Sequence, residues 1–255
     1  MRIKLTLQTS STKCTIPLNY NYFLTSAIYH TLETSSPAYS SFLHNHGYQY
    51  NSKKFKLFTY SQLFAEKRRI VDNTLQILST DVTWYLTSPM DDFVQSFVDG
   101  LFNKGQFIIG GYTFALLRAE TLQEPEFKNE MRFKCLSPIT ISTKIEKEGK
   151  LLLKYCEPGE EFNKLIRQNL IRKHEVLYGK PPEDDTFKLE FDQEYVSRRN
   201  GNISKLIDFK GIKIRGYLAP ATVSGSPELI KVGYRCGLGD KNSAGFGMVE
   251  AANTR

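Results

Sequence analysis

The sequence lacks a long apolar segment and any cluster of metal-binding residue types. No hydrophobic run approaches the roughly 20 residues of a membrane-spanning helix, and residues 1–7 alternate like a strand instead of resembling a signal peptide. The four histidines and four cysteines (Cys14, Cys135, Cys156 and Cys236) show no C-x-x-C or zinc spacing. We therefore expect a cytoplasmic protein with buried free thiols and with no membrane association, metal ion or cofactor.

The composition is that of an ordinary folded protein with an excess of positive charge. Hydrophobic residues make up 40% of the 255 residues and charged ones 24%, too much hydrophobicity for a disordered chain. Since single domains usually hold roughly 100 to 200 residues, the chain has room for one large or two small cores, and we favour two. The net charge of +7 favours a polyanionic partner, because lysines and arginines near phosphates release condensed counterions.

Residue patterns in the N-terminal half predict the order β-α-β-β-α-β. Alternating or β-branched and aromatic residues predict strands at 2–8, 55–62, 82–87 and 112–122. Apolar residues at helical spacing predict helices at 21–32 and 90–102.

A second, less regular cycle follows. We expect strands at 131–136, 139–145, 187–195, 211–219 and 246–251, and helices at 160–178 and 227–236. The repeated unit predicts an α+β protein with two tandem ferredoxin-like (RRM-like) βαββαβ domains. We place these domains at residues 1–126 and 127–255, because the polar, proline-marked stretch 125–130 is typical of a linker.

The C-terminal segment 237–247 is dense in glycine. It contains Gly237, Gly239, Gly245 and Gly247, and between them the possible hydrogen-bond donors Lys241, Asn242 and Ser243. Free backbone N–H groups in such a loop can hold a phosphate, although a tight structural connection would also need glycines. An ATP-binding loop is disfavoured, because the residue after Gly245 is phenylalanine and not lysine.

The residues at 232–249, from Val-Gly-Tyr-Arg-Cys to Gly-Phe-Gly-Met-Val, resemble the glycine-rich signature that ends the repeat-processing endoribonucleases of CRISPR systems. These enzymes belong to the repeat-associated (RAMP) superfamily of ferredoxin-like proteins. The resemblance extends to Ile28-Tyr29, Phe42-Leu43-His44 and the stretch 56–61, and so covers nearly the whole chain. It implies cleavage of precursor CRISPR RNA within its repeats, with the seven glycine-rich-segment residues above in contact with the RNA. A non-catalytic CRISPR repeat RNA-binding protein of the same superfamily is the alternative.

RNA carries its own nucleophile, the 2′-hydroxyl, so cleavage needs only proton transfer and positive charge near the phosphorane. Histidine suits the proton transfer because its ordinary pKa of about 6.5 leaves both forms populated near neutrality. The resemblance implies a catalytic set of Tyr29, His44 and Lys56. His44 would move the proton, Tyr29 would position or help activate the 2′-hydroxyl, and Lys56 would stabilise the phosphate charge. The products would be a 2′,3′-cyclic phosphate and a 5′-hydroxyl.

Some alternatives stay open. The segment 45–55 is longer than in close family members, so His46 can replace His44, and Lys53 or Lys54 can replace Lys56. The repeat sequence and the form of the bound RNA, a hairpin or an extended strand, are also open. The same holds for the retention of product, for contacts with other CRISPR effector proteins and for the choice between monomer and homodimer.

Two further groups of basic residues lie in the C-terminal half. Lys213 and Arg215 would share one face of a strand with Tyr217, where they would bind RNA or remain solvated. His174, beside Arg172 and Lys173 in the predicted helix, is expected on a solvated face.

Overall fold

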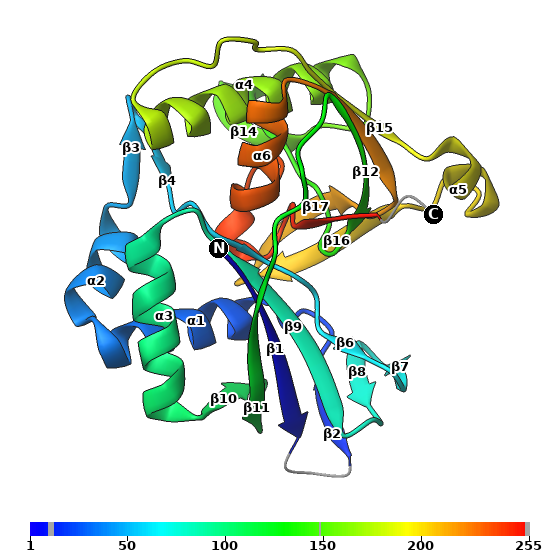
Figure 1. The fold of residues 1–255 in the computed structure, drawn as a ribbon. Helices are drawn as coiled ribbons and strands as arrows, with labels where there is room; N and C mark the ends of the chain where they lie inside the picture. Colours follow the sequence, from blue (N-terminus) through cyan, green and yellow to red (C-terminus); the bar gives the residue numbers. More distant parts are fainter. Residues whose placement is uncertain (10–12, 148, 253–255) are drawn as a thin grey trace.

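Strand β1 (Arg2–Thr9) lies inside the first sheet of the computed structural model, which describes residues 1–9, 13–147 and 149–252. Its alternate residues Ile3, Leu5 and Leu7 are buried, as the twofold periodicity of a strand requires. The antiparallel neighbours are β9 (Asp81–Thr87) and β11 (Tyr112–Leu122). The strands predicted at 2–8, 82–87 and 112–122 are confirmed (Figure 1).

Helices α1 (Asn21–Ser35) and α3 (Asp91–Lys104) pack on one face of this sheet and on each other (Figure 1). Both were predicted, and both are confirmed. The short α2 (Pro37–Asn45) follows α1 directly. Gly100 of α3 is buried where the two long helices cross, and a Cβ atom there would overlap the backbone carbonyl of Thr31.

The first sheet has the order β10-β11-β1-β9-β5, with β6 also paired to β9. The remaining short strands of this half form a three-stranded arm, β2-β8-β7, and a hairpin of β3 and β4. The bounds of these strands and of the short strands in the first sheet are β2 Cys14–Pro17, β3 Tyr48–Tyr50, β4 Lys53–Phe55, β5 Thr59–Tyr60, β6 Phe64–Ala65, β7 Arg68–Val71, β8 Thr74–Ile77 and β10 Gln106–Ile109.

The strand predicted at 55–62 shrinks to β5, because Leu57 adopts a left-handed conformation with φ of 53°. This turn sends Leu57 into the second hydrophobic cluster while its neighbour Phe58 packs in the first. The alternation of side chains along a strand cannot reveal that two adjacent residues serve two different cores.

The second sheet has the order β15-β18-β12-β19, and α4 and α6 pack against it. The bounds are β12 Glu130–Cys135, α4 Glu160–Tyr178, β15 Phe187–Phe191, β18 Ala221–Gly225, α6 Pro227–Cys236 and β19 Val249–Ala251. In the first sheet the four strands of the repeated unit have the order β11-β1-β9-β5, and in the second sheet they have the order β19-β12-β18-β15. Numbered along the chain within each unit, both orders are fourth, first, third, second. The chain therefore consists of two tandem ferredoxin-like folds, as predicted.

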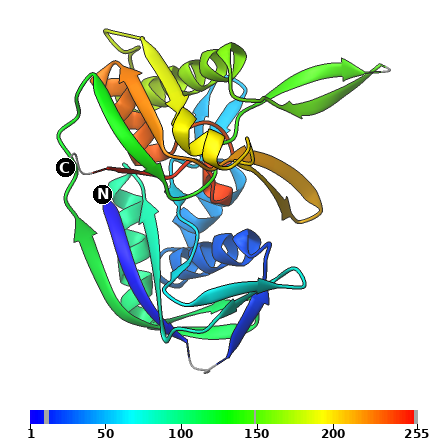
Figure 2. The same ribbon diagram turned by 90° about the vertical axis from the view of Figure 1, so that its right-hand side faces the viewer.

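Three strand predictions in the second half need correction. The stretches 139–145 and 211–219 do not join the sheet; their strands belong to two hairpins, β13 (Ser142–Lys147) with β14 (Lys150–Tyr155), and β16 (Ser204–Phe209) with β17 (Ile212–Tyr217). The strand at 187–195 ends early, since the carboxylate of Asp192 caps α5 (Gln193–Arg198). The sheet strand β18 was not predicted, and neither were the hairpin strands β14 and β16. Figure 2 shows the β13–β14 hairpin projecting from the body, which explains how its apolar residues can pattern like a buried strand yet stay exposed.

The first strand of the chain also contacts the second domain. The guanidinium group of Arg2 is buried, lies 3.7 Å from the ring centroid of Tyr234 in α6, and donates to the Tyr234 carbonyl. In the residue ranges that the structure describes, no helix is long and apolar enough to cross a membrane.

Gly100→Ala should destabilise the protein by about 1–3 kcal/mol, because the added methyl group must displace the α1 backbone. Helix propensity alone predicts the opposite sign, a gain of about 1 kcal/mol. Urea unfolding measures the difference. Phe102→Ala is the control, since that ring on the same helix is 75% exposed and its loss should change stability by less than about 0.5 kcal/mol. A Gly100→Ala variant as stable as wild type, or more stable, would contradict the close contact between α1 and α3.

Candidate active site

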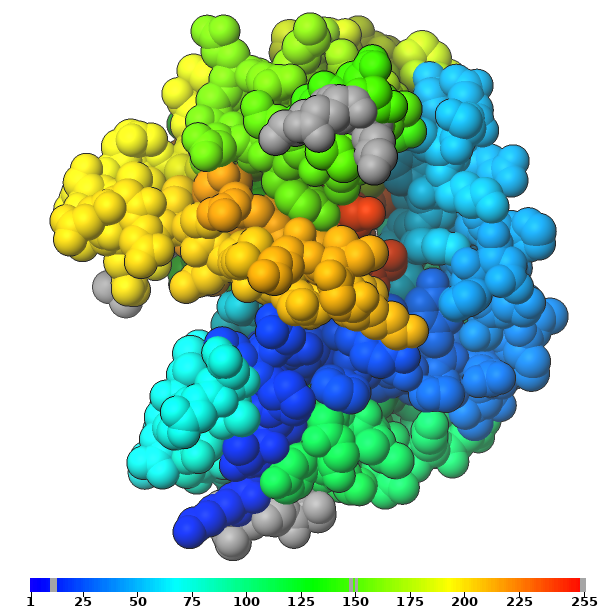
Figure 3. All heavy atoms as spheres, turned by 180° about the vertical axis from the view of Figure 1, so that it is seen from behind, coloured from blue at the N-terminus to red at the C-terminus, as the bar shows by residue number. Residues whose placement is uncertain are grey.

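A pocket of about 620 Å³ lies where α1 and α2 meet the C-terminal glycine-rich segment. Figure 3 shows this side of the molecule: the red C-terminal segment lies in a hollow between the orange β16–β17 hairpin and the blue N-terminal elements. Tyr29 from α1, His44 from α2 and Lys56 after β4 all line the pocket. The structure therefore brings the three predicted catalytic residues together.

These three residues form a connected group. The rings of Tyr29 and His44 meet edge to face, with centroids 5.8 Å apart and planes at 83°. The Nζ atom of Lys56 donates to the backbone carbonyl of His44 over 2.9 Å. On its other side Tyr29 packs against the buried ring of Phe58, which fixes its position relative to the first core.

The alternatives to His44 and Lys56 lie elsewhere. His46 is exposed at the end of α2 and does not line this pocket. Lys53 and Lys54 line an adjoining pocket of about 370 Å³, which Lys56 shares. Lys54 donates to the Asn45 carbonyl at 3.1 Å. By position, His44 and Lys56 are the better candidates.

Burial changes the acid-base behaviour of two residues in the group. It raises the pKa of Tyr29 to about 12, so the phenol is neutral at physiological pH. Desolvation, and then repulsion from Lys54, lowers the pKa of Lys56 below the ordinary lysine value. Within residues 1–9, 13–147 and 149–252, no three His, Cys, Asp or Glu side chains come close enough to hold a metal ion.

The glycine-rich segment reaches both pockets. Gly239, Lys241, Asn242 and Ser243 line the smaller pocket, and Ser243 also lines the larger one. Lys241 is exposed and takes a left-handed conformation with φ of 56°, at the start of a short 3₁₀ turn, Asn242–Ala244. Lys241 and Ser243 thus lie beside Lys56, and Ser243 also lies beside Tyr29 and His44. The side-chain amide of Asn242 is not free, because Nδ2 donates to the carbonyl oxygens of Leu238 and Phe246.

The role predicted for the glycine N–H groups is wrong at three positions. Gly237, Gly245 and Gly247 donate their N–H groups to carbonyl oxygens of the protein, so these donors are not free for a phosphate. The glycines allow close packing instead. A Cβ atom on Gly245 would overlap the ring of Tyr60, which belongs to the first domain.

A buried lysine that the sequence analysis missed holds this segment. The Nζ atom of Lys173 donates to the carbonyl oxygens of Gly237 at 2.7 Å and Gly239 at 2.9 Å, and to Oδ1 of Asn242 at 2.7 Å. Burial lowers the pKa of Lys173 to about 8. Its spacing with Phe162 and Ile166 continues the buried stripe of α4, a signal that could have identified it.

His174 is also buried, so the prediction of a solvated face is wrong. Its Nδ1 atom lies 3.0 Å from the Lys180 carbonyl, and Nε2 lies 3.6 Å from a carboxylate oxygen of Glu228 in α6. Because α6 and the glycine-rich segment both cover α4, the buried face of this helix is wider than its apolar residues indicate.

Lys213 and Arg215 lie apart from the catalytic group. Both are exposed on β17 and line neither pocket. Arg215 donates to the Ser204 hydroxyl at 3.0 Å. Tyr217, predicted on the same face, is buried in the second core.

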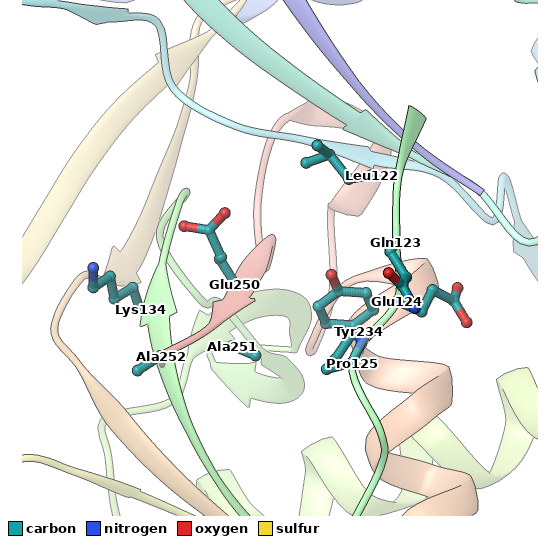
Figure 4. A pocket seen from close by; sticks show the side chains of 9 residues that line it. All are labelled: Leu122, Gln123, Glu124, Pro125, Lys134, Tyr234, Glu250, Ala251 and Ala252. Carbon is teal, nitrogen blue, oxygen red and sulfur yellow. The ribbon is translucent and has the colours of Figure 1, made fainter. Parts of the chain in front are cut away.

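A further pocket of about 660 Å³ lies at the connection between the two sheets (Figure 4). Its wall includes Tyr234, Glu250 and the connecting residues Gln123–Pro125. The Glu124 carboxylate forms a bidentate pair with Arg235, at 2.7 and 2.8 Å. None of the predicted catalytic residues lines this pocket.

Comparison with solved structures defines the class of protein. The structure titled "An RAMP protein binding different RNA substrates" matches with a TM-score of 0.84 at 28% identity, over 99% of this chain and 100% of that one. A Cas6-related protein from Pyrococcus furiosus matches with a TM-score of 0.86 at 30% identity, over 100% and 99% of the two chains. The fold is that of the RAMP proteins.

Sequence comparison narrows the class to one family. Residues 15–120 match the family described as "CRISPR-associated protein Cas6, N-terminal", and residues 122–251 match "CRISPR associated protein Cas6, C-terminal". The chain belongs to the Cas6 family. It is 35% identical to CRISPR-associated endoribonuclease Cas6 1 of Methanocaldococcus jannaschii, over 98% of this chain and 92% of that protein. It is 32% identical to a putative CRISPR-associated endoribonuclease-like protein Cas6 of Pyrococcus furiosus, over 98% of each.

Lys173→Met should lower the free energy of unfolding and loosen the glycine-rich segment. The change removes the ammonium donor of three oxygen acceptors, at a cost of about 1–3 kcal/mol for each buried acceptor left unpaired. Urea unfolding measures the loss, and amide hydrogen exchange locates it in residues 237–247. Lys164→Met, at an exposed site on the same helix, is the control. Equal stability of the two variants would contradict the role of Lys173.

The same pair of proteins gives a pH test. Between about pH 8 and the ordinary lysine value of 10.5, the unfolded chain binds more protons at position 173 than the folded chain does. Stability therefore rises with pH in this window. We expect wild type to gain stability relative to Lys173→Met from pH 8 to 10. A flat difference would mean that the pKa of Lys173 is not lowered.

Proposed function

We propose that this chain is an endoribonuclease that cleaves precursor CRISPR RNA within its repeats. The observation that carries the proposal is the single pocket lined by Tyr29, His44 and Lys56, beside the donors of the glycine-rich segment. Relatives that match nearly the whole chain are named CRISPR-associated endoribonucleases, which supports the same activity.

The proposed reaction uses the 2′-hydroxyl of the RNA as nucleophile. Its oxygen forms a new bond to the adjacent phosphorus, and the bond from phosphorus to the 5′-oxygen breaks. His44 accepts or donates the proton that moves, and the leaving oxygen ends as a 5′-hydroxyl. The other product carries a 2′,3′-cyclic phosphate. The proposal needs no metal ion, because the nucleophile belongs to the substrate and proton transfer is left to side chains.

The surroundings of Tyr29 and Lys56 indicate which of them positions the substrate and which stabilises the developing charge. A phenol with a pKa of about 12 is a poor base near neutrality, so Tyr29 serves as a hydrogen-bond donor that positions the reacting ribose or phosphate. Lys56 supplies a partly desolvated positive charge, which stabilises the phosphorane more strongly than a fully hydrated charge. We assign catalysis to residues 1–126 and the RNA-binding loop to 127–255.

A protein that binds repeat RNA without cutting it is the second candidate. One relative is named endoribonuclease-like, and one similar structure is titled for binding different RNA substrates. Fold and glycine-rich segment suit both functions, so only a cleavage measurement separates them.

His44→Ala should slow cleavage of a labelled repeat RNA in EDTA by about 10²- to 10⁴-fold, the usual contribution of general acid-base catalysis. A 2′-deoxy substitution at the cut site should block the reaction in wild type. His46→Ala is the matched control and should cut at the wild-type rate. If wild type binds the repeat but never cuts it, the binding function is correct.

Lys56→Arg should change the alkaline limb of the rate profile. As pH rises through the lowered pKa of Lys56, the lysine loses its charge and the cleavage rate falls. This fall occurs at a pH below 10.5, the ordinary pKa of lysine. Arginine stays protonated throughout, so the variant should keep its rate to higher pH, even if its maximum is lower. Single-turnover cleavage rates from pH 6 to 10.5 provide the measurement. Identical alkaline limbs would exclude Lys56 as the titrating group.

A further inference from the structure

A second group of residues lines the same pocket, at a distance from Tyr29, His44 and Lys56. It consists of Tyr22 in the first turn of α1 and of Phe209 and Lys210 at the tip of the β16–β17 hairpin. The rings of Tyr22 and Phe209 meet edge to face with centroids 5.9 Å apart. The Lys210 ammonium lies 4.2 Å from the Tyr22 ring centroid.

The hairpin turn places these side chains. Lys210 and Gly211 both have positive φ, 54° and 80°, the pattern of a two-residue type I′ turn. Lysine is unusual at the first of these positions, where asparagine or glycine is preferred. The turn is closed by Asp208, whose carboxylate accepts from the Gly211 N–H at 2.7 Å.

The hairpin tip is tied to the first domain. The Asp208 N–H donates to Oδ1 of Asn19, just before α1, at 3.0 Å. Figure 3 shows the tip of the orange hairpin resting on the blue N-terminal elements. One wall of the pocket therefore comes from each domain, and the aromatic pair spans the boundary.

The Tyr22 hydroxyl and the Lys210 ammonium are the polar side-chain groups of this cluster. Among the residues that the structure describes, no carboxylate forms an ion pair with Lys210, and no side chain hydrogen-bonds the Tyr22 hydroxyl. Both rings are only partly buried. A pair of rings that served solely to seal the domain boundary would be buried. Half-exposed rings with an unneutralised cation in a pocket match the chemistry of a nucleobase stacked beside its phosphate.

The spacing relates this cluster to the scissile bond. Tyr22 and Tyr29 are separated by seven residues of one helix, a rise of about 10.5 Å. Stacked nucleotides rise by about 3.4 Å along a strand. A base on Tyr22 would thus belong to a nucleotide about one to three positions from the phosphate beside His44.

We propose that Tyr22, Phe209 and Lys210 form a nucleobase-stacking subsite for an unpaired nucleotide near the cleavage site. The inference rests on the proposed RNA-cleaving function and adds a specific contact to it. One nucleobase stacks on the aromatic pair, and Lys210 binds the phosphate of that nucleotide. The hairpin thereby couples RNA binding to the contact between the two domains.

The test is a binding matrix of protein variants against RNAs with one missing base. A repeat RNA with a 2′-deoxy cut site is made in an intact form and in forms with a single abasic nucleotide at each flanking position. Dissociation constants are measured for wild type, Tyr22→Ala, Tyr22→Phe and Lys210→Ala. Lys205→Ala and Leu206→Ala, exposed on the same hairpin, are the controls.

We expect Tyr22→Ala to weaken binding of intact RNA about tenfold, and Tyr22→Phe, which keeps the ring, to restore it. One abasic position should weaken wild type to a similar degree and should not weaken Tyr22→Ala further. Lys210→Ala should weaken binding and reduce its salt dependence. The two controls should bind like wild type.

Two other outcomes are distinguishable. In the first, wild type binds and cuts the repeat, but the losses of binding free energy caused by Tyr22→Ala and by the abasic nucleotide add at every position. The proposed subsite is then wrong, and the proposed function stands. If wild type neither binds nor cuts repeat RNA, both proposals fail. Thermal unfolding of each variant shows whether a substitution weakens binding only because it unfolds the protein. If Tyr22→Ala does so, the binding of Lys210→Ala tests the subsite instead.

Discussion

The buried ammonium of Lys173 fixes the segment through which the two domains meet. It holds oxygen atoms of Gly237, Gly239 and Asn242, and so defines the path of the chain up to the last strand. The held segment then contacts the first domain, where Asn21 donates to the Ala244 carbonyl at 3.0 Å. A charge buried without its acceptors would be very costly, so lysine and segment depend on each other. The candidate active site lies at this contact.

The pocket combines contributions that neither domain has alone. The first domain supplies Tyr29 and His44 from two helices and Lys56 from the connection between β4 and β5. The second supplies donors from the glycine-rich segment and the tip of the β16–β17 hairpin. Two lysines, Lys56 and Lys210, line the same pocket as the neutral phenol of Tyr29.

Much of the fold could be predicted because helices depend on local spacing. All four long helices, α1, α3, α4 and α6, begin and end near the predicted residues. It was harder to predict which strands join a sheet, since alternating apolar residues look the same in a sheet and in a projecting hairpin. One strand of each inserted hairpin was therefore assigned to the second sheet, while the partner strands β14 and β16 and the sheet strand β18 were missed. The catalytic candidates came from resemblance, and no spacing rule would have preferred His44 to His46.

The sequence by itself determined the two repeats, the basic character and the residue types on which the proposed function depends. Tertiary structure decided which of these groups act together. The glycines at 237, 245 and 247 proved to be packing positions, because neighbouring groups fill the space where a Cβ atom would lie. At Gly237 and Gly245 these groups include Thr59 and Tyr60 of the first domain. Lys173 turned out to be internal, and Tyr22 came to face Phe209 across the domain boundary. Such contacts join residues more than 60 positions apart, so no local pattern records them.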